Sequence, residues 1–218
     1  MLPFAHDARS SLTAFDHAWA AFALGVALGA APGPVQLLIL SESAKGGLAR
    51  GLRVMLGANG MLVAILLALA LGLSAIEPSE DVLRALKVAG GVFLVALGMM
   101  ELRSLARHDP DQPLPPPVGQ PTLRGVMLVI LNPGAWVFIA TTGSAVIAVA
   151  TSEGGRPAGV ATALALGIGV SCSDLTFAVL GSGGRRAVGD RGVHVIRAVL
   201  SVALIGLGLW FVWQGVAG

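Results

Sequence analysis

The sequence contains little charge, no tyrosine and only one cysteine. Charged residues make up 12% of its 218 residues, whereas 55% are hydrophobic, and the mean hydropathy is +0.82. A soluble domain carries about 25% charged residues to cover its surface, so this composition excludes an ordinary soluble protein. The 30 glycines fit close packing of helices in lipid. We therefore expect an integral membrane protein whose main solvent is the lipid bilayer.

Other absences remove whole classes of function. The single cysteine, Cys172, excludes an intrachain disulfide and a two-cysteine redox relay. Neither an HExxH nor a GxSxG motif is present, so the sequence does not indicate an enzyme. The net charge is +2, but the basic residues form no block, and we expect no nucleic-acid partner. We also expect no metal site and no cofactor, since no histidine falls at membrane depth; the histidines are His6, His17, His108 and His194.

Long stretches without charge locate the membrane-spanning helices, because about 20 apolar residues cross a bilayer. The first stretch is interpreted as a span and not as a cleaved signal peptide, because Asp7 and Asp16 offset Arg9 before it. Segment 157–184 is interrupted only by Asp174. We expect about six spans, over residues 18–41, 54–76, 82–102, 125–152, 157–184 and 198–218.

Lysine and arginine favour the cytoplasmic side of a membrane, and their distribution sets the expected orientation. With the N-terminus outside, ten of the 14 basic residues fall on the cytoplasmic side and four fall outside. Both termini are then extracytoplasmic. Glu42 and Lys45 fall at the cytoplasmic membrane edge, where we expect a solvated anchor and not a site.

A proline-rich stretch, residues 104–122, divides the chain into residues 1–103 and 123–218, with three expected spans each. Half of the 12 prolines lie in this stretch, which predicts an extended cytoplasmic linker. Because three spans are an odd number, any repeat is inverted. Pro32-Gly33 and Pro133-Gly134 occupy matching positions and predict breaks in the first and fourth helices. We thus expect an all-α membrane protein built as two inverted three-helix repeats.

Two weaker patterns accompany the breaks. Leu94–Gly98 (LVALG) ends the third span much as Leu204–Gly208 (LIGLG) ends the sixth. Gly25 and Gly29 have the spacing of a helix-pairing motif, which leaves a homo-oligomer open.

Asp174 is the only carboxylate well inside an expected span. A charged group there costs about 2.5–3.5 kcal/mol on insertion scales, so we expect it to face the protein interior and to carry protons. The alternative is a neutral carboxyl bonded to Ser171 or Ser173 with no transport role. From their depth, four polar side chains are expected to line one pocket in the cytoplasmic half of the membrane, namely Gln36, Asn59, Asn132 and Asp174.

Three motifs resemble those of the LysE/RhtB family of amino-acid exporters, in order and over essentially the whole chain. Ala31-Pro32-Gly33-Pro34 is similar to the PGP motif of the family's first helix. Gly47–Gly51, followed by Gly57, is similar to its glycine-spaced entry to the second helix. Leu131-Asn132-Pro133 is similar to the Asn-Pro motif that opens its fourth helix.

The chain departs from the family pattern at two positions. Gly134 stands where the family commonly has lysine, and Met61 stands where a fourth glycine of the second-helix series would fall. The resemblance implies export of amino acids or similar small metabolites from the bacterial cytoplasm across the inner membrane, driven by the proton gradient.

The breaks, the polar residues and the resemblance together give an expected site. Asp174 is the expected proton-coupling residue, and the expected substrate-binding residues are Pro32, Gly33, Pro34, Gln36, Asn59, Asn132, Pro133 and Ser171. The leading hypothesis is a proton-coupled exporter of an amino acid. The alternatives are a metal-cation exporter of the same superfamily and a membrane scaffold that transports nothing.

Overall fold

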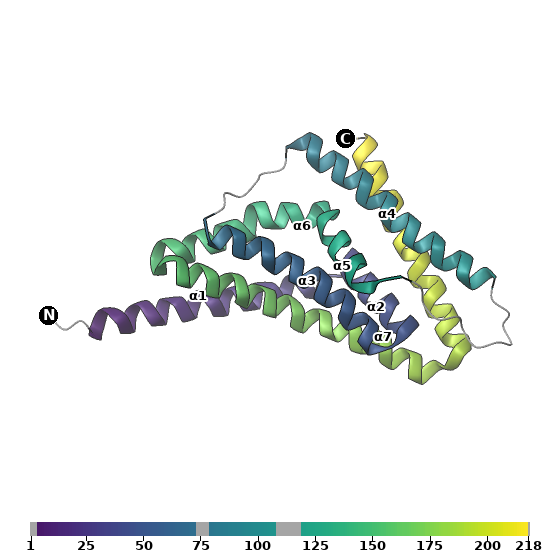
Figure 1. Ribbon diagram of the computed structural model, residues 1–218, viewed down its shortest axis with the longest axis horizontal. Helices are drawn as coiled ribbons and strands as arrows, with labels where there is room; N and C mark the ends of the chain where they lie inside the picture. The colour runs from purple at the N-terminus through teal and green to yellow at the C-terminus, as the bar shows by residue number, and fades with distance from the viewer. Residues whose placement is uncertain (1–3, 73–78, 108–118, 218) are drawn as a thin grey trace. The chain divides into compact units, whose positions relative to one another are not determined.

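The structure, a computed structural model, describes residues 4–72, 79–107 and 119–217, with side chains described except at 4–14 and 185–191. The described residues form helices and no strand, as Figure 1 shows. This confirms the all-α class. The helices are α1 (Phe4–Ala30), α2 (Pro34–Gly46), α3 (Leu48–Ala70), α4 (Glu80–Ala106), α5 (Pro121–Ile130), α6 (Pro133–Phe138), the π-helix η1 (Ile139–Gly143) and α7 (Ser144–Ala217).

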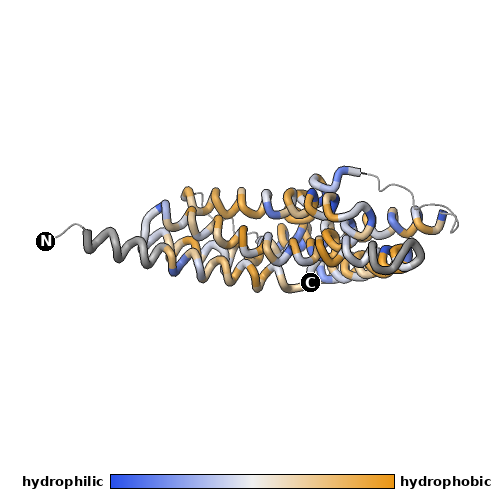
Figure 2. The backbone as a smooth tube through the Cα atoms, turned by 90° about the horizontal axis from the view of Figure 1, so that it is seen from below, coloured by the Kyte–Doolittle hydropathy of each residue, from blue (hydrophilic) through white to orange (hydrophobic). Residues whose placement is uncertain are grey.

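Hydrophobic residues, drawn in orange in Figure 2, recur along the described helices. Among the described residues, four helical stretches are long and apolar enough to cross a membrane, or five if α1 and α2 form one broken span. One of the four, Pro133–Gly184, has 52 residues, whereas a single crossing needs about 20. Gly155 within it has a φ of +71°, which no regular helix contains. The chain is therefore an all-α membrane protein, and the count of six spans stays a prediction.

Both predicted helix breaks are present. α1 ends at Ala30, and α2 starts with Pro34 at its first position, after Gly33 in an extended conformation with φ −145° and ψ −173°. α5 ends at Ile130, and α6 starts with Pro133. Proline supplies no backbone donor and disfavours helical geometry in the residue before it, so each proline ends one helix and begins another.

The proline-rich linker overlaps the helices at its two ends. Residues 104–106 close α4, and Pro121 opens α5 at the first helical position, where proline is favoured. The expectation that no part of 104–122 is helical is therefore wrong at its edges. Residues 108–118 lie outside the described residues.

Contacts within the chain define two compact units, and each draws on both sides of the linker. The expected division into two repeats at the linker is not tested by this grouping and stays a prediction. Unit 1 comprises Met1–Ala31, Asn59–Glu77 and Gly134–Ser173. Unit 2 comprises Pro32–Ala58, Pro78–Pro133 and Asp174–Gly218.

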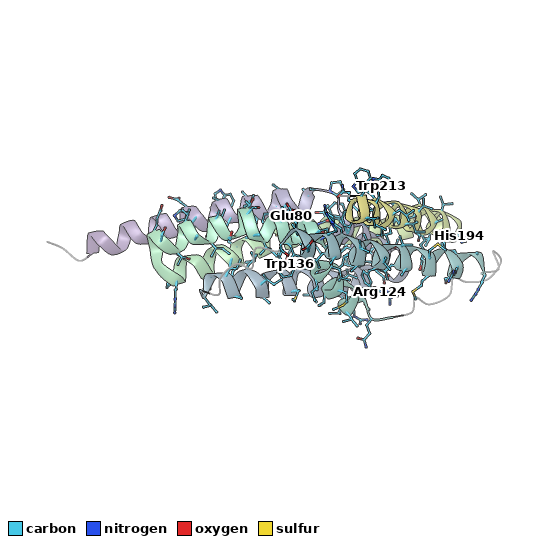
Figure 3. The ribbon with its side chains drawn as sticks, turned by 90° about the horizontal axis from the view of Figure 1, so that it is seen from above. Glu80, Arg124, Trp136, His194 and Trp213 are labelled. Carbon is cyan, nitrogen blue, oxygen red and sulfur yellow. The ribbon has the colours of Figure 1, made fainter. Side chains whose placement is uncertain are left out.

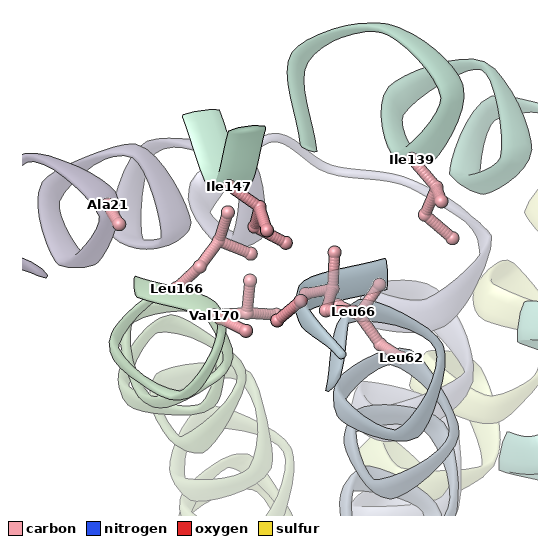
Figure 4. Packing of buried hydrophobic residues seen from close by; sticks show 9 residues of the cluster. Ala21, Leu62, Leu66, Ile139, Ile147, Leu166 and Val170 are labelled. Atoms are coloured by element: carbon pink, nitrogen blue, oxygen red, sulfur yellow. The ribbon is translucent and has the colours of Figure 1, made fainter. Parts of the chain in front are cut away.

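Unit 1 is held by an apolar core between α1, α3 and α7, which Figure 4 shows from close by. Leu66 and Leu166 are fully buried in it. Glycines bring α1 against α7: a Cβ added to Gly25 would lie 2.1 Å from the Leu166 carbonyl oxygen, and one added to Gly169 would lie 2.1 Å from that of Phe22. Only glycine permits this approach of the two backbones.

Unit 2 has its own core, built around Leu38, Leu94 and Leu204. Its α4 and α7 meet through two similar contacts, in which a Cβ at Gly91 would lie 2.5 Å from the Gly208 carbonyl oxygen and one at Gly98 would lie 2.6 Å from that of Ser201. When LVALG is aligned with LIGLG, Gly91 becomes equivalent to Ser201, and Gly98 becomes equivalent to Gly208. Under this alignment each of the two contacts maps onto the other. The exchange is compatible with the predicted repeat, which stays a prediction.

Candidate functional site

The predicted proton-coupling residue lies in unit 2, where α7 faces the first turn of α2. The Asp174 side chain is fully buried, and its Oδ1 accepts a hydrogen bond of 3.0 Å from Nε2 of Gln36. Gln36 is the third residue of α2, directly after the break at Gly33. The partial positive charge at the start of a helix favours a neighbouring carboxylate. The break thus positions both an amide donor and a helix N-terminus next to Asp174.

Two other predicted residues pair in unit 1. Nδ2 of Asn59, on α3, donates a hydrogen bond of 3.0 Å to Oγ of Ser171 on α7. Ser171 Oγ in turn donates to the Gly167 carbonyl oxygen at 2.8 Å, and Ser173 Oγ donates to the Val26 carbonyl oxygen at 2.8 Å. Both serine hydroxyls therefore donate to backbone oxygens of unit 1.

The predicted residues of the two break motifs differ in burial. Pro32 is exposed, and Gly33 and Pro34 are partly buried. Asn132 is partly buried, with its backbone N–H bonded to the Val129 carbonyl oxygen at 3.3 Å, and Pro133 is buried. The expectation that Gln36, Asn59, Asn132 and Asp174 line one pocket stays a prediction.

The expected solvated anchor at Glu42 and Lys45 is wrong. The Glu42 side chain is 0% exposed and that of Lys45 is 5% exposed. Glu42 accepts from Lys45 Nζ at 3.2 Å, from Arg124 Nη1 at 2.7 Å and from Nε of Arg50. Arg124, labelled in Figure 3, reaches Glu42 from α5, and Arg50 does so from the first turn of α3. The charges are buried because α3 and α5 pack against the end of α2, which a span prediction from hydropathy does not detect.

A second carboxylate, which is partly buried, extends this group to α4 and α7. Glu101 lies 3.1 Å from Nζ of Lys45 and 2.6 Å from Nε of Arg197, whose side chain is fully buried. Buried charges of this kind are retained in proteins only when they are paired. We call the six side chains the Glu42 network; its members are Glu42, Lys45, Arg50, Glu101, Arg124 and Arg197.

An apolar depression of about 670 Å³ lies elsewhere in unit 2, near the end of α7. Trp210 and Trp213 line it together with Gly206, Leu209 and Val216, and Trp213 is labelled in Figure 3. No ionisable side chain lines this depression, so it fits lipid chains better than a polar substrate. The tryptophans are exposed, as the amphipathic rings at a membrane interface are.

The part of the chain that the structure describes contains no group of three or more His, Cys, Asp or Glu residues that could hold a metal ion. Unit 2 holds a buried carboxyl with an amide donor and a network of ion pairs, and unit 1 holds a serine–asparagine pair. A break precedes each of the helices α2 and α6. Broken helices that present polar groups inside a membrane protein are typical of secondary transporters.

Comparison with known proteins agrees with this description. Neither the curated proteins nor the solved structures gave a match to the chain. A family model does match it, and the match begins in α1, before the first break, and ends in the last turn of α7. It is the model of the LysE type translocators, which matches residues 26–215, and the chain belongs to this family.

Proposed function

We propose that this translocator is a secondary transporter that exports an amino acid or a related small metabolite from the bacterial cytoplasm in exchange for protons. Membership of its family makes it a multi-pass membrane transport protein. The proposal of exchange for protons rests on one observation: Asp174 is buried, and Nε2 of Gln36 lies 3.0 Å from its Oδ1. An ionisable group inside a membrane span is by default a functional residue, because it is costly to insert.

Reversible protonation of Asp174 gives the site two states. The ionised carboxylate forms a charge-assisted hydrogen bond with Gln36, which is about twice as strong as a bond between neutral groups. It also interacts favourably with the N-terminus of α2. A proton removes the charge and weakens both interactions. Protons that arrive from outside thus change how α2 is held against α7, and we assign proton coupling to Asp174 on this ground.

The broken helices supply groups for a substrate with an ammonium and a carboxylate. A helix break leaves backbone carbonyl oxygens and N–H groups without helical partners, and these can bind the two charged ends of an amino acid. We propose substrate contacts at both breaks and at amide and hydroxyl side chains within each unit. The residues are Pro32, Gly33, Pro34, Gln36, Asn59, Asn132, Pro133 and Ser171.

Uptake into inside-out membrane vesicles tests the proposal, because export then fills the vesicle. A panel of labelled amino acids is offered with and without a pH gradient that is acid inside the vesicle. We expect accumulation of at least one of them that depends on the gradient, and we expect Asp174→Asn to abolish it. Asp81→Asn is the matched control, because Asp81 is exposed in the first turn of α4.

The other outcomes assign the protein differently. If no amino acid accumulates under any gradient, the amino-acid proposal is wrong, and the panel is repeated with divalent metal ions. Accumulation of a metal ion identifies the metal-cation exporter. If nothing is transported by a folded protein, the scaffold becomes the better description.

A further inference from the structure

Helix α2 is bounded by a backbone break at each end. Its first residue, Pro34, follows the extended Gly33, and its last residue, Gly46, precedes Gly47 with a φ of +77°. Glycine adopts this left-handed conformation at little cost, and such positions serve as hinges in many proteins. The 13 residues between the breaks form one regular helix. α2 is therefore a short rigid element between two joints.

The two ends of α2 carry different polar contacts in unit 2. Gln36, in the first turn, contacts Asp174, whereas Glu42 and Lys45, toward the last turn, belong to the Glu42 network. At 1.5 Å per residue, Gln36 and Glu42 are about 9 Å apart along the helix axis. Because a helix does not stretch, a displacement at one end moves the other.

Lys45 connects the two carboxylates of the Glu42 network. Its Nζ lies 3.2 Å from Oε1 of Glu42 and 3.1 Å from Oε2 of Glu101. Buried ion pairs are costly to break singly, because the partner that remains is left buried without its counter-charge. Separation of one pair therefore favours separation of the others, which suits the network to a two-state element. Through the two carboxylates, Lys45 links α2 to helices α3, α5, α4 and α7, which supply Arg50, Arg124, Glu101 and Arg197.

We propose that α2 couples the proton site at Asp174 to a gate formed by the Glu42 network. The gate lies at the end of unit 2 that the distribution of basic residues predicts to be cytoplasmic, and the inference rests on the proposed export function. Protonation of Asp174 weakens the bond to Gln36 and frees the first turn of α2. The helix then moves, the ion pairs at its other end separate, and the site opens to the cytoplasm, where the proton is released. Both contacts bias one two-state element, which is the physical requirement for coupling.

The accessibility of a single buried thiol tests this coupling. Ala178 is fully buried on α7, one turn after Asp174, in the same apolar cluster as Leu38 and Ile39 of α2. Ala178→Cys is made in a Cys172→Ser background, because Cys172 is exposed. Inside-out vesicles are treated with a membrane-impermeant maleimide, and the labelling rate is measured by mass. We expect slow labelling of this parent and about tenfold faster labelling when Glu101→Gln or Asp174→Asn is added.

Two controls separate opening of the gate from loss of fold. Ala163→Cys places the thiol in the core of unit 1, where Ala163 is also fully buried. Unfolding raises labelling at both positions, whereas the gate raises it at Ala178→Cys alone. The conservative substitution Glu101→Asp keeps the negative charge between Lys45 and Arg197 and should keep labelling close to the slow parental rate.

The proposal of a gate is wrong if Glu101→Gln and Lys45→Met both leave the labelling rate of Ala178→Cys unchanged. The role of α2 is tested with Gln36→Leu, which already removes the contact to Asp174. If Asp174→Asn accelerates labelling as much in the Gln36→Leu background as without it, α2 is not the link. The assay uses no substrate, so its result does not depend on whether the transport assay succeeds.

Discussion

Gln36 Nε2 lies 3.0 Å from Asp174 Oδ1, and both side chains are buried in unit 2. The bond joins the first turn of a helix that starts at a proline-glycine break to a carboxylate inside a predicted span. A local irregularity of the backbone and an ionisable group are thereby placed in direct contact. That contact is the basis of both the proton-coupling proposal and the proposed role of α2.

A double-mutant cycle measures the strength of this contact. We expect Gln36→Leu to destabilise the folded protein by about 1.5–3 kcal/mol, because the bond is made to a carboxylate. In an Asp174→Asn background, Gln36→Leu should cost about 1 kcal/mol less. This difference is the coupling energy of the two side chains, and it exceeds the average for a hydrogen bond between membrane helices. Unfolding in mixed detergent, followed by circular dichroism, provides the free energies. Additivity of the two substitutions within about 0.3 kcal/mol would show that the side chains do not interact.

Asp174→Asn separates proton coupling from substrate binding. Asparagine keeps the shape of the side chain but carries no ionisable proton, so net export driven by a pH gradient should cease. Exchange of labelled for unlabelled substrate across the membrane moves no net proton and should continue near the rate of the unsubstituted protein. Counterflow in vesicles measures this exchange. Loss of both activities by a folded protein would mean that Asp174 binds substrate instead of coupling protons.

Burial decides how much an ion pair contributes to stability, and two glutamates of this chain allow a matched comparison. Glu42 is 0% exposed, with three cationic partners, whereas Glu153 is 54% exposed and pairs with His17 at 2.8 Å. We expect Glu42→Gln to cost about 3–5 kcal/mol, because it leaves buried cations without their counter-charge. Glu153→Gln should cost no more than about 1 kcal/mol. Equal losses, measured by unfolding in mixed detergent, would indicate that water reaches Glu42 in the folded protein.

The parts of the fold that depend on local sequence were predicted correctly. Hydropathy over about 20 residues is a local property, and it identified apolar helices. The missing amide of proline is also local, so Pro32-Gly33 and Pro133-Gly134 marked the two breaks, after which α2 begins at Pro34 and α6 at Pro133. The span count is harder to predict, because Pro133–Gly184 is longer than one crossing, and the only positive φ found within it is that of Gly155, two residues before Pro157.

The site itself depends on which helices meet, and a single sequence carries little information on that. The expected depth in the membrane is similar for Gln36 and Asp174, but depth alone does not predict that the two side chains form a hydrogen bond. Glu42 was assigned to solvent because a hydropathy window ends at the first charge, while its burial is decided by α3 and α5. One signal was available: Glu42 and Lys45 are spaced i, i+3 at a helix end, on the side where ten basic residues were predicted.

Substitution by alanine should have opposite effects on stability at two glycines of unit 2. A Cβ at Gly91 would lie 2.5 Å from the Gly208 carbonyl oxygen, whereas a Cβ at Gly206 would have nothing within 4 Å. Gly91→Ala must push α4 away from α7, and overpacking of this kind costs about 1–3 kcal/mol. Gly206→Ala should instead stabilise α7 by up to about 1 kcal/mol, because alanine has the higher helix propensity. Thermal unfolding in detergent measures both changes. If Gly91→Ala is as harmless as Gly206→Ala, α4 and α7 do not pack backbone to backbone at this position, and the exchange of contacts expected from the repeat loses its support.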